Sequence, residues 1–240
     1  MANLILQEFV PLITAFVIML NSIGGIFGVV VVPYNPERVE VTLGNNVISN
    51  VDEVLDCYNS AVKKTGFVLG SSSYDLSEFS FDTDNEDIKQ LAEIYVQSLE
   101  SSSTAVFAVP GEGVISPSDV KSAKMSVKDG KKTIIINVKD YSHGASDKKT
   151  DNPISNAYGY STDMLSAFES NGVTISGGDM EISYTDCTIS CVIDEKSGKI
   201  IYGDWDTSCL FEADNLTMNF KDTKITIGDF SFETVSYIDV

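Results

Sequence analysis

The chain has few basic residues and almost no histidine. Its 240 residues include 16 lysines and arginines against 35 aspartates and glutamates, and His143 is the sole histidine. The formal net charge is −19. Nucleic acids and anionic lipids attract clustered positive charge, so this balance argues against either as a partner. The acidity itself mainly keeps a protein soluble.

The cysteines lack the spacing of a metal site. Cys57 stands alone, Cys187 and Cys191 are four residues apart, and Cys209 follows later. A structural zinc site needs four ligands, usually from two close Cys or His pairs. No glycine-rich turn joins a strand to a helix, which excludes the common nucleotide-binding motifs. We therefore predict no metal and no cofactor. Buried thiols and one disulfide among the last three cysteines both stay open.

No catalytic constellation is recognisable. Ser142, His143 and Asp147 are neighbours in a polar segment, but triads are assembled from convergent groups, so we expect an exposed loop histidine there. Residues 82–93 superficially resemble a calcium loop, but Asp87 stands where the sharp turn demands glycine. We predict no catalytic residues, and a protein that is not an enzyme.

One long uncharged run stands out against this background. Residues 9–32 contain no charged side chain. As a helix rising ~1.5 Å per residue, 24 residues cover ~36 Å, enough to cross a hydrocarbon core of ~30 Å. The run lacks the basic start and small-residue cleavage site of a secretory signal peptide. We therefore favour a membrane signal-anchor helix over a cleaved signal or a buried core helix, with the rest of the chain outside the cell.

The remaining sequence predicts a linker over 33–47 and one domain over 48–240. Asn50 and Glu53 have capping-box spacing, and apolar residues recur at helical intervals until Gly66. Similar signals predict a second helix from Thr83 to about Ser101 and a third over 163–170.

Two hairpins are predicted after these helices. Asp129-Gly130 is a strong turn signal that pairs Lys128 with Lys131, and Met125 with Ile134. A longer hairpin spans 180–211 around residues 194–199, and further strands begin at Leu216. The sequence therefore predicts an α+β fold, a curved antiparallel sheet of about six strands with two or three helices on one face.

Aromatic residues of the last strands are the candidate ligand-binding residues: Trp205, Phe211, Phe230 and Phe232. They line a site for an apolar ligand only if the core is incompletely filled. A single tryptophan alternating with Cys209 and Phe211 is more often simply core.

Several short segments resemble exported proteins of Gram-positive bacteria that have no assigned function. These segments are Glu53-Val-Leu-x-x-Tyr58-Asn59-x-Ala61-Val62-x-Lys64, Ile115-Ser-Pro117-x-Asp119-Val120-Lys-Ser-Ala-Lys124, Thr133-Ile-Ile-Ile-x-Val138-Lys-Asp140, Ile182-Ser-Tyr184-Thr-Asp-Cys-Thr188-Ile189 and Asp194-x-Lys-Ser-Gly198-Lys199-Ile200. The last segment is also similar to PepSY-type domains and to lipoprotein carriers of the LolA/LppX type. The carrier resemblance implies a sheet wrapped around an apolar cavity. The chain departs from those lipoproteins because no cysteine follows its apolar run.

Two functions follow as hypotheses. The first is a non-enzymatic binding or interaction domain at a bacterial cell surface, membrane-anchored or secreted, for an apolar ligand or a cell-envelope protein. The second is a glycan-acting hydrolase that uses two carboxylates, with Asp204 and Asp206 beside Trp205 as the one cluster worth naming.

Overall fold

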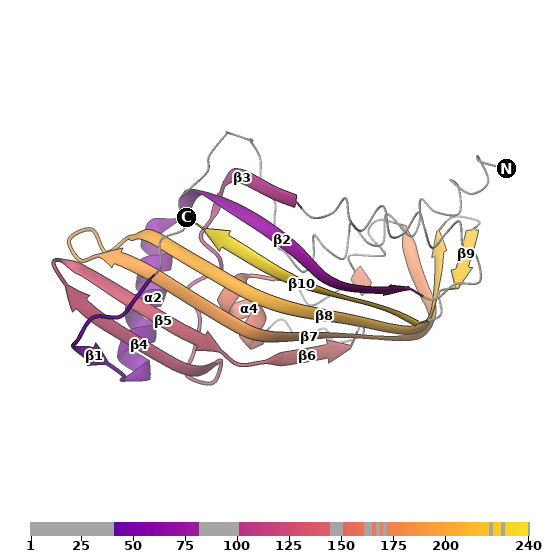
Figure 1. Cartoon of the computed structure of the whole chain (residues 1–240), viewed down its shortest axis with the longest axis horizontal. Helices are drawn as coiled ribbons and strands as arrows, with labels where there is room; N and C mark the ends of the chain where they lie inside the picture. The colour runs from indigo at the N-terminus through magenta and orange to yellow at the C-terminus, as the bar shows by residue number, and fades with distance from the viewer. Residues whose placement is uncertain are drawn as a thin grey trace.

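The structure is a computed structural model in which one antiparallel sheet contains most of the described residues (Figure 1). It describes residues 41–81, 101–144, 151–160, 165–166, 169, 172–220, 223–226 and 229–239. Ten strands lie within these ranges, in the order β1-β4-β5-β7-β8-β10-β2-β3, while β6 pairs with β7 and β9 with β8. The elements are β1 (Val47–Ile48), α2 (Val51–Thr65), β2 (Phe67–Phe81), β3 (Ser101–Ala108), β4 (Val120–Lys128), β5 (Lys131–Val138), β6 (Tyr141–Gly144), α4 (Pro153–Tyr158), β7 (Val173–Asp194), β8 (Ile200–Phe220), β9 (Thr223–Thr226) and β10 (Asp229–Asp239).

The predicted helix after residue 50 is α2. The Asn50 side chain accepts a hydrogen bond from the Glu53 backbone N–H, which caps the first turn. Gly66 ends the helix with φ at 70°, and its N–H donates to the Val62 carbonyl. The buried stripe of the helix is the apolar one seen in the sequence: Val54, Leu55, Tyr58, Ala61 and Val62.

Helices α2 and α4 each contribute a tyrosine that forms a hydrogen bond with β8. Trp205 Nε1 donates to the Tyr58 hydroxyl of α2 at 2.9 Å, and the Tyr158 hydroxyl of α4 donates to the Asp206 carbonyl oxygen at 2.9 Å. The alternating residues 205, 207, 209 and 211 of β8 are all buried, as the period-2 pattern predicted. The core therefore lies between the helices and one face of the sheet.

The first hairpin has the predicted register. Lys128 pairs with Lys131 and Met125 with Ile134. The turn residues Asp129 and Gly130 have φ of 52° and 74°, the positive values that this two-residue turn requires.

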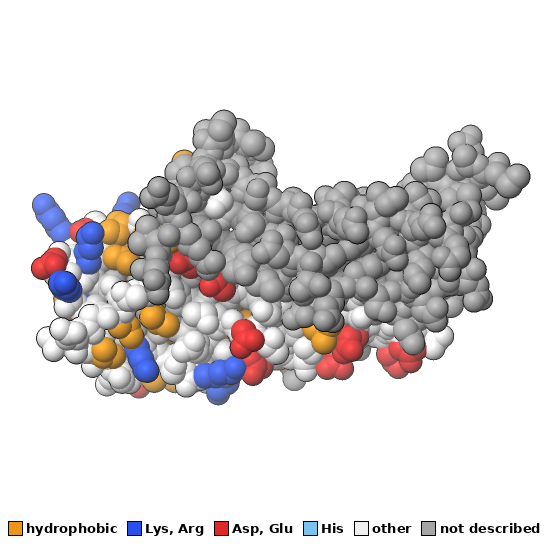
Figure 2. Space-filling model, in the orientation of Figure 1, with side chains coloured by type: hydrophobic (Ala, Val, Ile, Leu, Met, Phe, Trp, Pro, Cys, Tyr) orange, Lys and Arg blue, Asp and Glu red, His pale blue; other side chains and the backbone are white. Residues whose placement is uncertain are grey.

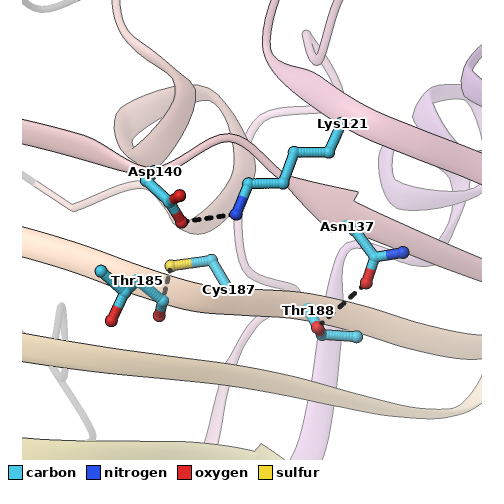
Figure 3. Close-up of polar contacts among 6 residues, drawn as sticks. All are labelled: Lys121, Asn137, Asp140, Thr185, Cys187 and Thr188. Atoms are coloured by element: carbon cyan, nitrogen blue, oxygen red, sulfur yellow. Dashed lines mark hydrogen bonds and ion pairs between the residues drawn. The ribbon is translucent and has the colours of Figure 1, made fainter.

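Strand β7 changes its partner at a bulge. Residues 188–194 of β7 pair with β5, and the pairing ends where Thr188 lies opposite Asn137. Residues 181–184 of β7 pair with β6, beginning with Tyr184 opposite Tyr141. Between them the register with β8 shifts from Thr185 to Thr188. Figure 3 shows the contacts of this region: Thr188 donates to the Asn137 side chain at 3.4 Å, and Cys187 Sγ donates to the Thr185 carbonyl at 3.4 Å. The Lys121–Asp140 ion pair, at 2.6 Å, spans the gap between β4 and the start of β6.

The prediction of a mostly antiparallel, β-rich fold is confirmed. The sheet has more strands than the sequence suggested, partly because β2 and β3 had no recognisable pattern. The prediction of a new strand from Leu216 is wrong, since that segment continues β8. The helix predicted after Thr83 lies outside the described residues. Of the helix predicted over 163–170, residues 165, 166 and 169 are described, and all three are helical.

The predicted anchor over 9–32 and most of the predicted linker also lie outside the described residues. Within the described ranges, no helix combines the length and the hydropathy needed to cross a membrane.

Candidate functional site

A groove opens on the surface between α2 and the sheet. Its volume is about 380 Å³. The residues that line it are Glu53, Asp56, Cys57, Ser60, Lys64, Met125, Lys132, Ile193, Glu195 and Gly198. We call this feature the α2 groove.

One side of the groove is a single face of α2. The five helical residues that line it are spaced three or four apart, or adjacent, so they project from the same side of the helix. The other side comes from three segments of the sheet that are distant in sequence. Met125 of β4 and Ile193 of β7 are buried there, whereas Lys132 of β5 is half-buried. The groove thus has a small apolar floor and a charged rim.

The rim carries charges of both signs. Glu53, Asp56 and Glu195 are exposed acidic side chains, and they share the groove with two lysines. In the described part of the chain, no ion pair joins these acidic side chains to the groove's lysines. Their charges are therefore available to a partner.

Cys57 lines the groove, and Cys191 lies near Cys57 but does not line the groove. Cys57 is half-buried and Cys191 of β7 is fully buried. Burial, and then the neighbouring Cys57, raises the pKa of the Cys191 thiol well above its usual value. The thiolate is the reactive form, so Cys191 is chemically inert at neutral pH. None of the four cysteines forms a disulfide, which agrees with the alternative of buried thiols.

The structure places two of the four candidate ligand-binding residues in the core. Trp205 and Phe211 have 0% of their surface exposed. A side chain that lined a cavity of ligand size would keep surface accessible to a water-sized probe. In this conformation neither residue adjoins such a space.

The other two candidates belong to the neighbouring strand. Phe232 of β10 pairs with Phe211 of β8, and Phe230 pairs with Ala213. The register therefore brings Trp205, Phe211 and the two β10 positions into adjoining strands. The side chains of Phe230 and Phe232 lie outside the described atoms.

The prediction of an exposed loop histidine is wrong. His143 is 4% exposed and lies in β6, paired with Ile182 of β7. Its ring stacks between Tyr141 and Tyr184, with ring centroids at 5.8 and 6.1 Å. The sequence around it is polar, and β6 was missed because its four residues pair with a strand nearly 40 residues later.

Two further tyrosines, Tyr160 and Tyr158, extend this series of ring contacts. Tyr160 lies between Tyr158 and Tyr184, with ring centroids at 5.4 and 6.4 Å. Burial is the main cause that raises the pKa of all three hydroxyls well above the usual value, and it does the same for Tyr58. These phenols stay protonated at neutral pH, as expected for core residues rather than general bases.

The carboxylates considered for hydrolysis lie on β8. Asp204 is 6% exposed and accepts hydrogen bonds from the Tyr202 hydroxyl at 3.3 and 3.4 Å. Asp206 is half-buried beside the inward-facing Trp205. Neither residue lines the α2 groove. Among the described residues, no group of three or more His, Cys, Asp or Glu side chains is arranged to hold a metal ion.

Comparison of the chain with protein-family models, with curated proteins and with solved structures gives no match. The resemblance to exported Gram-positive proteins therefore stays an expectation from the sequence.

Sequence reasoning did not find the α2 groove. The helical spacing of Glu53, Asp56 and Lys64 was visible, but such a charged stripe usually marks a solvated helix face. What makes it a groove is the approach of Lys132 and Glu195, more than 60 residues later. No local sequence pattern indicates that these residues lie close to α2.

Proposed function

We propose that this chain is a non-enzymatic binding domain, held at a bacterial cell surface by residues 9–32, which binds a polar partner of the cell envelope in the α2 groove. The uncharged run and the acidic domain that follows it support the tether and the outside location. The observation that carries the binding site is the open groove whose acidic side chains and lysines form no ion pair with one another among the described residues. The enclosed core supports a polar partner rather than an apolar one.

The free-energy cost of opening the core to a ligand favours the α2 groove as the binding site. An apolar ligand beside Trp205 and Phe211 would have to displace fully buried side chains in a packed interior. A ligand in the α2 groove displaces only water. An apolar ligand there would also remove charged groups from water without compensation.

The distribution of charge suggests the kind of ligand. Asp56 and Lys64 lie on the same face of α2, eight residues apart, which corresponds to ~12 Å along the helix. A molecule with an ammonium group and a carboxylate or phosphate group can complement both. A short zwitterionic peptide is the simplest example of this class.

The test follows isoleucine methyl signals by NMR, using the full chain in detergent micelles. The two probes are the tripeptide Ala-Ala-Ala and palmitate. We expect the peptide to shift the Ile193 methyl saturably, since Ile193 lines the groove. We expect palmitate to leave Ile182 and Ile189 unchanged, since they pair with Phe211 and Trp205.

A matched pair of variants makes the test specific. Lys64→Gln should weaken the peptide response severalfold, because Lys64 lines the groove. Its exposed neighbour Lys63 does not line the groove, so Lys63→Gln should leave the peptide response unchanged. The proposal fails if the peptide shifts no groove methyl up to about 10 mM. A palmitate response at Ile182 and Ile189 would instead favour an apolar carrier.

A further inference from the structure

Lysines are concentrated at one end of this acidic protein. The α2 C-terminus and the β4–β5 and β7–β8 turns meet there: the Glu195 N–H donates to the Gly130 carbonyl at 2.9 Å, and the Ile200 N–H donates to Thr65 Oγ1 at 2.9 Å. Seven lysines lie on these segments, and we call them the lysine end: Lys63, Lys64, Lys128, Lys131, Lys132, Lys196 and Lys199.

In Figure 2 several blue side chains lie at the left end with a few red ones among them, whereas the lower edge carries both blue and red side chains and is mostly red toward the right. The acidic residues of the two turns are Asp129, Asp194 and Glu195. The Asp194 carboxylate is engaged within its own turn, where it accepts from the Ser197 backbone N–H at 2.7 Å and hydroxyl at 2.6 Å. The lysine end therefore has the opposite sign to the chain as a whole.

The chain enters the domain at the same end. The Gly44 N–H donates to Ser126 Oγ at 2.8 Å, and Val47 pairs with Ser126, two residues before Lys128. Val41, the first described residue, follows the uncharged run by nine residues. Nine residues span at most ~30 Å, so a membrane that holds residues 9–32 lies within that reach of Val41.

Because the sheet is long, the end at which the chain enters the domain determines which end of the sheet can lie close to the membrane. Strand β7 has 22 residues, which corresponds to roughly 70 Å of strand at ~3.3 Å per residue. Its Asp194 end belongs to the lysine end, and its Val173 end lies far from it (Figure 1). A short tether can therefore hold the lysine end, and not the opposite end, against a membrane.

We propose that the lysine end docks on the anionic phospholipid headgroups of the membrane that holds residues 9–32. This inference rests on the tether of the proposed function. The net charge of −19 does not prevent it, since the potential of the acidic parts decays over ~8–10 Å at physiological salt. The tether also keeps the lysines at a high local concentration beside the headgroups. The α2 groove, which shares Lys64 and Lys132 with the lysine end, then opens beside the membrane surface.

The test compares lysine acetylation of the full chain in two kinds of lipid nanodisc, one of phosphatidylcholine alone and one with about 30% phosphatidylglycerol. Mass spectrometry measures the modification rate at each lysine. We expect the rates at Lys128, Lys131 and Lys196 to fall about threefold or more in anionic discs at ~0.1 M salt, and to recover at ~0.5 M salt. Equal rates in the two discs would overturn the docking.

A charge-matched pair of variants controls for folding and net charge. The triple variant K128Q/K131Q/K196Q should abolish the lipid-dependent protection at Lys64 and Lys199. The control K121Q/K139Q/K224Q removes the same charge from exposed positions on other parts of the sheet, and should keep that protection. Equal behaviour of the two variants would also overturn the docking.

Co-elution with the discs tests the tether separately. A chain that does not co-elute with phosphatidylcholine discs refutes the tether. If it then binds anionic discs through the lysines, the docking stands without the tether. If it binds neither disc, both proposals fail.

Discussion

Trp205 Nε1 on β8 donates a 2.9 Å hydrogen bond to the Tyr58 hydroxyl on α2, and both side chains are almost completely buried. The bond joins residues 147 positions apart in sequence. It satisfies a donor that would otherwise be buried without a partner beneath the helix, and so fixes the register of α2 on the sheet.

Tyr58→Phe removes the acceptor and leaves the indole N–H buried and unsatisfied. We expect a loss of about 1–3 kcal/mol in the free energy of unfolding, measured by urea denaturation with an unchanged m-value. Tyr202→Phe is the control, because that residue is half-buried and its bonds to Asp204 are longer, at 3.3 and 3.4 Å. Equal losses in the two variants would contradict the special role of the Tyr58–Trp205 bond.

Local signals explain which elements the sequence predicted. The β4–β5 hairpin follows from a two-residue turn and an alternating pattern, and its observed register is the predicted one. Helix α2 follows from the Asn50 cap, the apolar stripe and Gly66. Each of these signals lies within about 15 residues of sequence.

Helix α4 was missed although its signals are present. Asn152 caps it by accepting from the Ile154 and Ser155 backbone N–H groups, Pro153 occupies its first turn, and Gly159 ends it with φ at 72°. Its six residues are too few to show a helical period. Short helices of this kind depend on packing, here of Tyr158 against β8.

Strand β2 was missed for a different reason. Its centre is the run Ser71-Ser72-Ser73, which has neither apolar alternation nor strand propensity. It forms because β10 and β3 pair with its two edges, at separations that no local pattern reveals. The candidate site could not be predicted for the same reason, since the α2 groove exists only where distant segments approach one another.

The turn residue Gly130 allows a test of the hairpin. Its φ is 74°, yet an added Cβ would meet no atom within 4 Å. Gly130→Ala therefore changes only the backbone strain, and we expect a loss of about 1–2 kcal/mol in the free energy of unfolding. Gly44→Ala, which would make an ordinary 3.5 Å contact with Ser126, should change stability by less than about 0.5 kcal/mol. Circular dichroism during urea denaturation measures both, and a neutral Gly130→Ala would contradict the turn conformation.

The buried thiol of Cys187 predicts a loss of stability at alkaline pH. Burial, and next the Asp140 carboxylate, raises its pKa to about 12, whereas a thiol in the unfolded chain has a pKa of about 8.5. Below pH 8.5 both states keep the proton, so stability is unaffected there; between about 8.5 and 12 only the unfolded state loses it, and stability falls as pH rises. By pH 10 this group alone should lower the free energy of unfolding by about 2 kcal/mol relative to pH 7.

Urea denaturation at the two pH values measures this loss. The free energy of unfolding should decrease less for Cys187→Ala than for the unmodified chain, and Cys57→Ala, at a half-buried position, serves as the control. An identical decrease in all three proteins would mean that Cys187 ionises as readily in the folded state as in the unfolded one.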